Sequence, residues 1–219
     1  MTQSLNPCFQ VGLDVLDKTC LIVGGGSEAA EKSGRLLGAG ARVRLVSPSR
    51  VPELEQLCAE QRIEYRPRRF EVGDLGNVFL VLNTVGTDLA LAEKIFASTR
   101  ERNILLNTYD QPGLSDIGMA ALVARGHLRL SISTSNASPG LARRLRQDLG
   151  NLFDGEFVEY IERLAEVRLH LKTSEADGRK RREKLRSTVW DFRLEGRLQY
   201  PQDWRRRLDE LMRDDAIKE

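Results

Sequence analysis

The first half of the chain alternates short apolar runs with longer amphipathic stretches. The run 78–82 is apolar at every position, which suits a strand that is covered on both faces of a sheet. Residues 88–102 instead repeat their apolar positions at helical spacing. On this basis the sequence predicts strands at 21–23, 41–47, 63–65, 78–82 and 104–107, and helices at 29–37, 52–61 and 88–102. Such alternation indicates an α/β fold with a doubly wound parallel sheet.

The pattern changes after Gly113. Two apolar segments within 119–134 flank Gly126-His127, and the second alternates apolar with polar residues, which predicts a hairpin. Ser138 and Pro139 suit the N-cap and first position of a helix that runs to about residue 153. We therefore expect three parts: a nucleotide-binding domain at 1–113, a hairpin and helix at 114–153, and a helical C-terminal domain at 154–219.

A glycine-rich turn follows the first predicted strand. Gly24, Gly26 and Ala29 fit the pattern G-x-G-x-x-G/A, in which the glycines allow a tight turn and a close approach of a pyrophosphate. The helix that starts there offers unpaired N–H groups and the positive end of its dipole to an anion. The neighbouring resemblance of 26–33 to a P-loop fails, because Glu31 stands where the second glycine is required.

Ligands of such sheets bind in the crevice at the carboxyl ends of the strands, so the residues that follow each strand should converge. The site residues that we expect are Gly24, Gly25, Gly26, Ser27, Glu28 and Ala29 after the first strand, Ser47, Pro48 and Ser49 after the second, Asn83 and Thr84 after the fourth, and Asn107 and Asp110 at the fifth.

Composition restricts the classes of protein that this chain can belong to. Of the 219 residues 41% are hydrophobic and 30% are charged, as in a globular protein, and no apolar run approaches the ~20 residues that span a membrane. Because the start of the chain also lacks a signal peptide, we expect a cytoplasmic protein. The three cysteines and two histidines have no metal-ligand spacing, so no metal site is expected.

Three separated segments carry a resemblance to a known family: 24–29, 104–110 and 130–144. The third reads Leu-Ser-Ile-Ser-Thr-Ser-Asn-Ala-Ser-Pro-Gly-Leu-Ala-Arg-Arg and is close to I-S-T-x-G-x-S-P-x-L-A-R. With the glycine motif and Asn-x-x-Asp at matching separations, the chain resembles precorrin-2 dehydrogenase, the NAD-dependent module of siroheme synthesis, over roughly its first 150 residues.

This resemblance implies a Rossmann domain, a middle segment that dimerises through exchanged strands, and a small helical C-terminal domain. It implies a homodimer that oxidises precorrin-2 to sirohydrochlorin, with NAD as hydride acceptor. Asp110 matches the family's active-site aspartate, so we expect it to accept the proton that is lost with the hydride. The resemblance also places the NAD ribose at Ser47, Pro48 and Ser49.

Alternatives stay open at this point. The second strand ends without the acidic residue that usually binds the ribose of NAD, and Arg50 could instead meet the 2′-phosphate of NADP or lie in solvent. Segments 83–86 and 116–120 depart from the family's A-T-D-D and F-I-F-P patterns, which leaves room for an altered substrate fit or a non-catalytic, NAD-binding regulatory module. Relatives that also insert iron use the same cleft, so that second activity is a further alternative.

The tail from Gly155 is polar and helical, with interruptions near 177–178 and 200–201. Its basic clusters and those at 143–146 are typical of solvated helix faces, because acidic residues are interspersed. Arginines near the cleft would attract precorrin-2, which carries eight carboxylates. Nucleic acid is not an expected partner, since no recognised binding motif is present.

Overall fold

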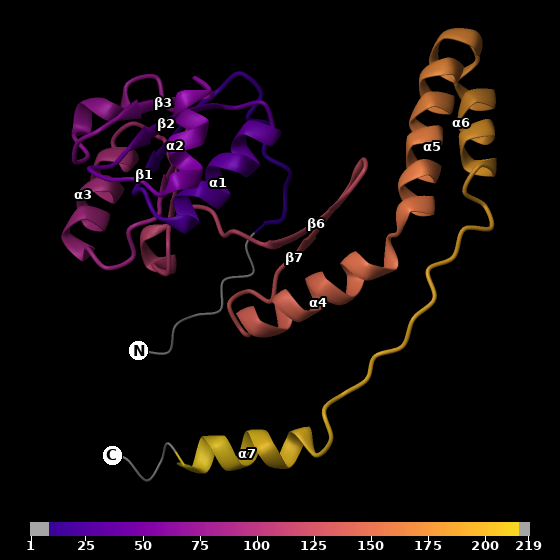
Figure 1. Ribbon diagram of the computed structural model, residues 1–219. Coiled ribbons are helices and arrows are strands. Elements are labelled where there is room, and N and C mark those ends of the chain that lie inside the picture. Colours follow the sequence, from indigo (N-terminus) through magenta and orange to yellow (C-terminus); the bar gives the residue numbers. More distant parts are fainter. Residues whose placement is uncertain (1–8, 215–219) are drawn as a thin grey trace. The chain divides into compact units, whose positions relative to one another are not determined.

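The computed structural model describes residues 9–214, and the first half of the chain forms a five-stranded parallel sheet (Figure 1). The strands are β1 (Thr19–Val23), β2 (Arg42–Val46), β3 (Ile63–Arg66), β4 (Leu80–Asn83) and β5 (Leu105–Thr108), arranged in the order β3-β2-β1-β4-β5. The chain fills one half of the sheet from β1 outwards and then crosses to β4 on the other side of β1. This confirms the predicted doubly wound sheet and places its topological switch point between β1 and β4, where such sheets bind ligands.

Helices cover both faces of the sheet. Helices α1 (Ser27–Gly38) and α2 (Pro52–Ala59) pack on one face, and α3 (Leu89–Arg100) packs on the other together with the short 3-10 helix η1 (Val72–Leu75). Alternate residues of β1 therefore enter two separate cores: Ile22 contributes to the first and Leu21 to the second. Burial on both faces explains why the central strands are apolar without alternation.

The predicted helix at 52–61 is two residues too long. The helix ends at Ala59, and Gln61 adopts a left-handed backbone conformation with a φ of 55°. That conformation turns the chain toward β3, and propensity alone did not reveal it. The third helix begins as expected, because the Asp88 carboxylate caps it by accepting a hydrogen bond from the N–H of Leu91 (2.9 Å).

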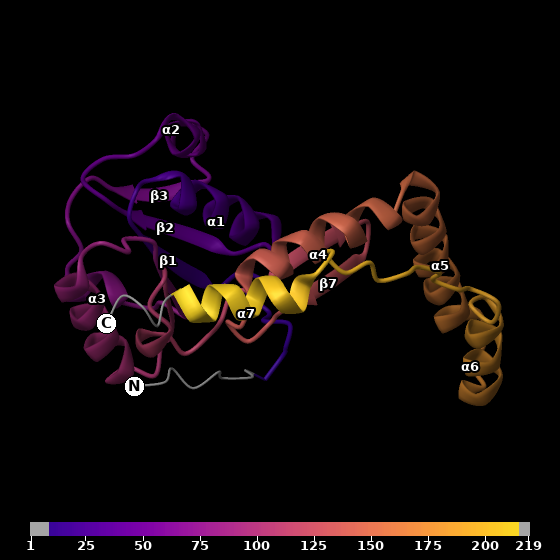
Figure 2. The same cartoon turned by 90° about the horizontal axis from the view of Figure 1, so that it is seen from below.

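The hairpin follows the sheet along the chain. Strands β6 (Ala121–Arg125) and β7 (Leu128–Ile132) pair antiparallel around the predicted turn, where Gly126 has a φ of 51°. Helix α4 (Pro139–Leu152) begins at the predicted cap, since Ser138 Oγ accepts a hydrogen bond from the N–H of Leu141 (3.2 Å). Figure 2 shows α4 beside the hairpin, on which it packs. One side of α4 is buried there, whereas Leu141 and Leu152 on another side are about half exposed.

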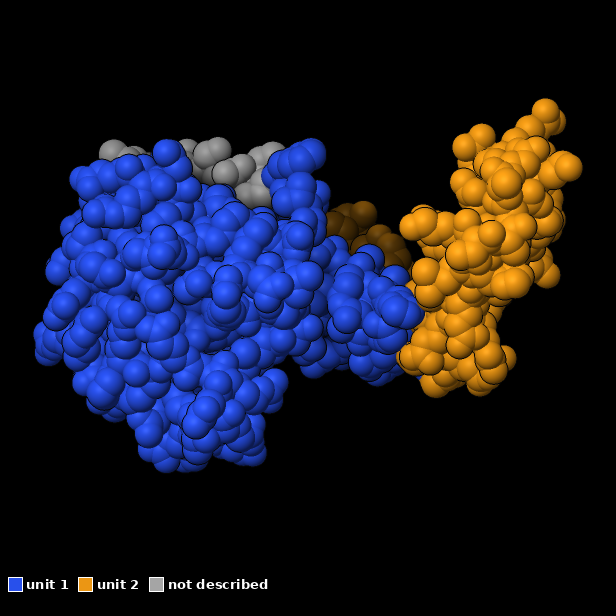
Figure 3. Space-filling view, turned by 90° about the horizontal axis from the view of Figure 1, so that it is seen from above, with its two compact units in different colours: residues 1–154 blue, residues 155–219 orange. Residues whose placement is uncertain are grey.

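The chain divides into two units, residues 1–154 and 155–219, which Figure 3 colours separately. The second unit contains α5 (Gly155–Ser174), α6 (Gly178–Ser187) and α7 (Trp204–Asp214). The ring of Tyr160 on α5 stacks on Phe192 at 5.7 Å between centroids, and its hydroxyl donates to the carbonyl of Thr188 (2.7 Å). The chain leaves helical structure after Ser187 to make these contacts, so the interruption predicted near 200–201 is longer than the sequence indicated.

Candidate functional site

The glycine turn lies between the carboxyl end of β1 and the first turn of α1. Gly24 has a φ of 111°, which favours glycine, and a β-carbon there would overlap the hydroxyl of Thr84. A β-carbon on Gly25 would overlap the carbonyl oxygen of Ser49. At Gly26, by contrast, no atom lies within 4 Å of the β-carbon position. The protein's own packing therefore requires the first two glycines, and the third leaves an open space.

The start of α1 borders this space. Gly26 is the N-cap, and no side chain caps the helix. The N–H groups of the first helical turn have no intrahelical acceptor, so those of Ser27, Glu28 and Ala29 can bind an anion together with the helix dipole. The Glu28 carboxylate is paired with the ammonium of Lys32 (2.9 Å), which offsets its negative charge. An open, uncapped helix start beside a glycine turn fits the pyrophosphate of a dinucleotide.

The loop after β2 lies against this turn. Ser47 is buried, its N–H donates to the carbonyl of Arg66 (3.3 Å), and its own carbonyl accepts from the hydroxyl of Tyr65 (3.0 Å). Pro48 and Ser49 are exposed. The loop is joined to the glycine turn by a hydrogen bond from the N–H of residue 51 to the carbonyl of residue 25 (2.9 Å). This arrangement fixes the loop at the position where doubly wound sheets hold the adenosine ribose.

Arg50 is not the solvated side chain that the sequence left as one alternative. Its guanidinium lies 4.2 Å from the centre of the Tyr65 ring. Its Nε is buried without a hydrogen-bond partner in the part of the chain that the structure describes, and the carboxylate of Glu55 is 3.9 Å away. Stacking on an aromatic ring is a common arrangement for arginine, and it holds this cation beside the ribose loop.

The ends of β4 and β5 form the other half of the site. Thr84 donates from both its N–H and its hydroxyl to the carbonyl of Val23 (2.9 Å each), so it ties β4 to β1. Asn83 is 1% exposed, its Oδ1 accepts from the N–H of Val85 (3.1 Å), and its Nδ2 has no partner within residues 9–214. The Nδ2 of Asn107 donates one hydrogen bond to the carbonyl of Ile117 (2.9 Å), which leaves its oxygen and its second N–H for a ligand.

Asp110 lies in the turn that follows β5. It is exposed and has a left-handed backbone with a φ of 55°. The preceding residue, Tyr109, donates its N–H to the carbonyl of Asn83 (2.8 Å), which ties this turn to the end of β4. The structure therefore brings the four predicted segments together at one edge of the sheet, and the expected convergence is confirmed.

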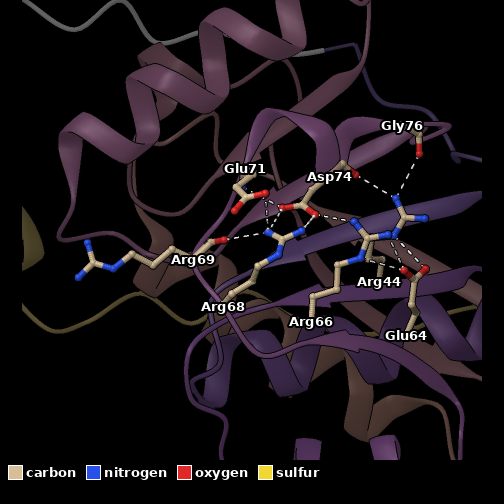
Figure 4. Close-up of polar contacts among 8 residues, drawn as sticks. All are labelled: Arg44, Glu64, Arg66, Arg68, Arg69, Glu71, Asp74 and Gly76. Atoms are coloured by element: carbon tan, nitrogen blue, oxygen red, sulfur yellow. Dashed lines mark hydrogen bonds and ion pairs between the residues drawn. The ribbon is translucent and has the colours of Figure 1, made fainter.

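A buried carboxylate near this edge was not predicted. Asp74 is fully buried and accepts hydrogen bonds from Arg66 (2.5 Å), from Arg68 (2.7 and 2.8 Å) and from the N–H of Glu71 (2.9 Å), as Figure 4 shows. Burial raises the pKa of Asp74, but the Arg68, Glu71 and Arg66 donors outweigh it and lower the pKa from 3.8 to about 2. Arg66 belongs to β3 and its carbonyl holds Ser47, so this cluster supports the ribose loop.

No three His, Cys, Asp or Glu side chains of residues 9–214 are grouped so that they could hold a metal ion. None of the helices in that range is both long and apolar enough to cross a membrane.

Comparisons with known proteins agree with this geometry. The family model described as "Putative NAD(P)-binding" matches residues 11–121. Precorrin-2 dehydrogenase of Bacillus subtilis (strain 168) is 35% identical over 151 residues, which are 69% of this chain and 92% of that protein. The solved structure of SirC, a precorrin-2 dehydrogenase, superimposes with a TM-score of 0.73 at 25% identity and covers 95% of this chain and 100% of that one.

A longer protein is also similar to the chain. Siroheme synthase of Thioalkalivibrio sulfidiphilus (strain HL-EbGR7) is 34% identical over 188 residues, or 86% of this chain. The match spans only 37% of that synthase, so the similarity concerns one portion of the larger protein.

Proposed function

Because the chain belongs to the precorrin-2 dehydrogenase family, we propose that it oxidises precorrin-2 to sirohydrochlorin in siroheme biosynthesis, with NAD as the hydride acceptor. The observation that carries this proposal is the arrangement of the sheet edge. An uncapped helix start with open space at Gly26 and the exposed carboxylate of Asp110 lie on the same edge. One half can hold a dinucleotide while the other faces a substrate.

The nucleotide half provides binding and orientation. The N–H groups at the start of α1 would hold the pyrophosphate, and the loop Ser47–Ser49 would hold the ribose. Asn83 and Asn107 are proposed contacts at the nicotinamide end, where each retains an unpaired amide atom. Thr84 contributes chiefly by its position, because both of its donors are engaged with β1.

The substrate half supplies the proton acceptor. Oxidation of the macrocycle removes a hydride and a proton, and bound NAD takes the hydride. Asp110 is proposed to take the proton, because its carboxylate follows β5 on the cofactor edge and lies open to a ligand. Its backbone is fixed by the neighbouring bond between Tyr109 and Asn83, which keeps the carboxylate at that edge.

A homodimer formed through the hairpin and α4 is part of this proposal. Leu141 and Leu152 on α4 are 51% and 49% exposed, and a second copy would bury them. Leu141→Asp should therefore shift the protein to monomers in light scattering, whereas Leu169→Asp on α5, where the leucine is 67% exposed, serves as the matched control. A dimer that survives Leu141→Asp would locate the interface elsewhere.

Cytoplasmic location also belongs to the proposal, because NAD-linked chemistry and the free Cys20 and Cys58 suit a reducing compartment.

The proposal is tested by incubating the purified chain anaerobically with precorrin-2 and NAD. The fluorescence of NADH should rise together with the absorbance of sirohydrochlorin, and neither should change when NAD is omitted. Binding of NAD without turnover would instead support the non-catalytic regulatory module. If neither NAD binding nor turnover occurred, the assignment of the sheet edge as a dinucleotide site would fall.

A further inference from the structure

Tyr109 presents an aromatic ring at the substrate half of the site. The residue directly follows β5 and is 49% exposed, although its neighbour Thr108 is 3% exposed. Among the described residues of the first unit, the exposed aromatic side chains are Tyr109 and Phe9, and Phe9 precedes the first strand. Tyr109 is therefore the exposed ring that lies at the carboxyl edge of the sheet.

The backbone beneath this ring is fixed from two sides. The N–H of Tyr109 donates to the carbonyl of Asn83 on β4 (2.8 Å). The residue before it is held as well: the N–H of Thr108 donates to Ser115 Oγ (2.9 Å), and the Thr108 hydroxyl donates to the carbonyl of Leu114 (2.9 Å). An exposed ring on a backbone that is held in this way costs little entropy to order when a ligand binds.

Gly86 makes room for the ring. A β-carbon at Gly86 would lie 3.0 Å from Cδ1 and 3.6 Å from Cε1 of Tyr109. The φ of Gly86 lies outside the left-handed region, so its backbone conformation does not demand glycine. The close approach of the aromatic ring is thus the physical reason for a glycine here. Gly86 ends the segment 83–86, in which the chain departs from its family's pattern. The position of the Tyr109 ring accounts for the glycine at the end of that segment.

We infer that Tyr109 is a substrate-binding residue whose ring stacks on the conjugated macrocycle, and that Gly86 acts through it by setting the position of the ring. This inference rests on the proposed function, because it takes the tetrapyrrole as the ligand of this edge. A macrocycle of pyrrole-derived rings offers an extended π-surface, for which an exposed aromatic side chain is a suitable partner. Asp110 is the next residue, so a ring stacked on Tyr109 lies beside the proposed proton acceptor.

The test separates binding of the tetrapyrrole from binding of the cofactor. Tyr109→Ala should weaken the affinity for sirohydrochlorin, measured without NAD by the change in its own fluorescence, by roughly 3- to 10-fold, the range that aromatic stacking supplies. The KM for precorrin-2 should rise by a similar factor, while the Kd for NAD stays unchanged. Tyr109→Phe should differ from the unaltered protein by less than about 2-fold, since it keeps the ring. Tyr200→Ala, which removes a 66%-exposed tyrosine from the second unit, is the matched control.

A second variant tests the role of Gly86 independently. Gly86→Val should displace the ring and weaken sirohydrochlorin binding in the unaltered background, but should add nothing in the Tyr109→Ala background. Additive losses would show that Gly86 does not act through Tyr109. If Tyr109→Ala weakened NAD instead of sirohydrochlorin, or neither, the inference would be overturned. An unaltered protein that neither turns over precorrin-2 nor binds sirohydrochlorin would refute the proposed function itself, and the two failures are therefore distinct.

Discussion

Replacing Asp74 by asparagine should destabilise the first unit. The carboxylate is fully buried and accepts from Arg66, Arg68 and the N–H of Glu71. Asparagine keeps the shape and one acceptor oxygen, but it removes the charge that the two guanidinium groups neutralise and turns the other oxygen into an NH₂ donor. Because both carboxylate oxygens of Asp74 accept hydrogen bonds, the substitution removes charge and hydrogen bonds together.

The magnitude follows from the lowered pKa of Asp74. A fall from 3.8 to about 2 corresponds to about 2 kcal/mol of stability at neutral pH, since one pKa unit is about 1.4 kcal/mol. The side chains of Arg66 and Arg68 are 31% and 38% exposed, so solvent screening reduces the expected loss to about 1–2 kcal/mol.

The sign of the pH dependence follows from the same pKa. Because the folded-state pKa is below the ordinary value, the stabilisation by Asp74 is complete above about pH 4 and is lost as the pH falls toward about 2. The difference in the free energy of unfolding between the two proteins should therefore be largest at neutral pH. It should shrink steadily below pH 4.

Urea denaturation followed by far-UV circular dichroism measures this difference. Trp190 and Trp204 both belong to the second unit, so tryptophan fluorescence follows that unit and should show no shift. Asp148→Asn is the matched control, because the Asp148 carboxylate is 53% exposed in its pair with Arg144 and should contribute less than about 1 kcal/mol. Equal stability of Asp74→Asn at pH 7, or a deficit that persists undiminished at pH 3, would refute the reasoning.

Three further predictions concern the cofactor and the reaction. Gly26→Asp should abolish NAD binding in calorimetric titration without unfolding the protein, because it places a charged side chain in the open space at the helix start. The control Gly34→Asp, on the exposed side of α1, should leave NAD binding intact. Unchanged NAD affinity in Gly26→Asp would contradict the assignment of this helix start as the phosphate site. Asp110→Asn should bind NAD normally but lose roughly 10²-fold or more in sirohydrochlorin formation, and full turnover would rule out its role as the base. NAD should support faster turnover than NADP. If the two rates are equal, and if Arg50→Ala lowers only the rate with NADP, Arg50 would instead be a ligand of the 2′-phosphate.

Most of the sheet could be predicted from the sequence, because its signals are local. The strand that ends at Val23 is apolar from Cys20 onwards and is followed at once by the glycines of the turn. The cap at Ser138 and the hairpin turn at Gly126 are likewise set by residues within a few positions of each other. Burial on both faces of a sheet and tight turns each require particular residue types within a few consecutive positions, so short stretches of sequence predict them.

The contacts that sequence reasoning missed join residues whose neighbourhood depends on the strand order. Arg50 meets Tyr65 because β2 and β3 are adjacent and parallel, with Val46 opposite Arg66. Tyr109 meets Gly86 because β5 lies beside β4. Asp74 appears in the sequence as one acid after a basic loop, and only the packing of η1 against the sheet buries it. The residue pattern of one segment therefore does not predict contacts with residues of another segment.

The structure also separates the residues that hold the edge together from those that meet a ligand. Each loop continues the sheet's hydrogen bonding one step past its strand: the N–H of Gly24 donates to the carbonyl of Val46 (3.0 Å), that of Thr84 to Val23 (2.9 Å), and that of Tyr109 to Asn83 (2.8 Å). The edge is therefore ordered by the protein's own bonds before a cofactor arrives. Substitutions at Gly24 or Gly25 should cost stability, because a β-carbon there would overlap Thr84 or Ser49. Gly26 and Asp110 are exposed and no donor of theirs takes part in these backbone bonds, so substitutions there should change binding and turnover while the fold persists.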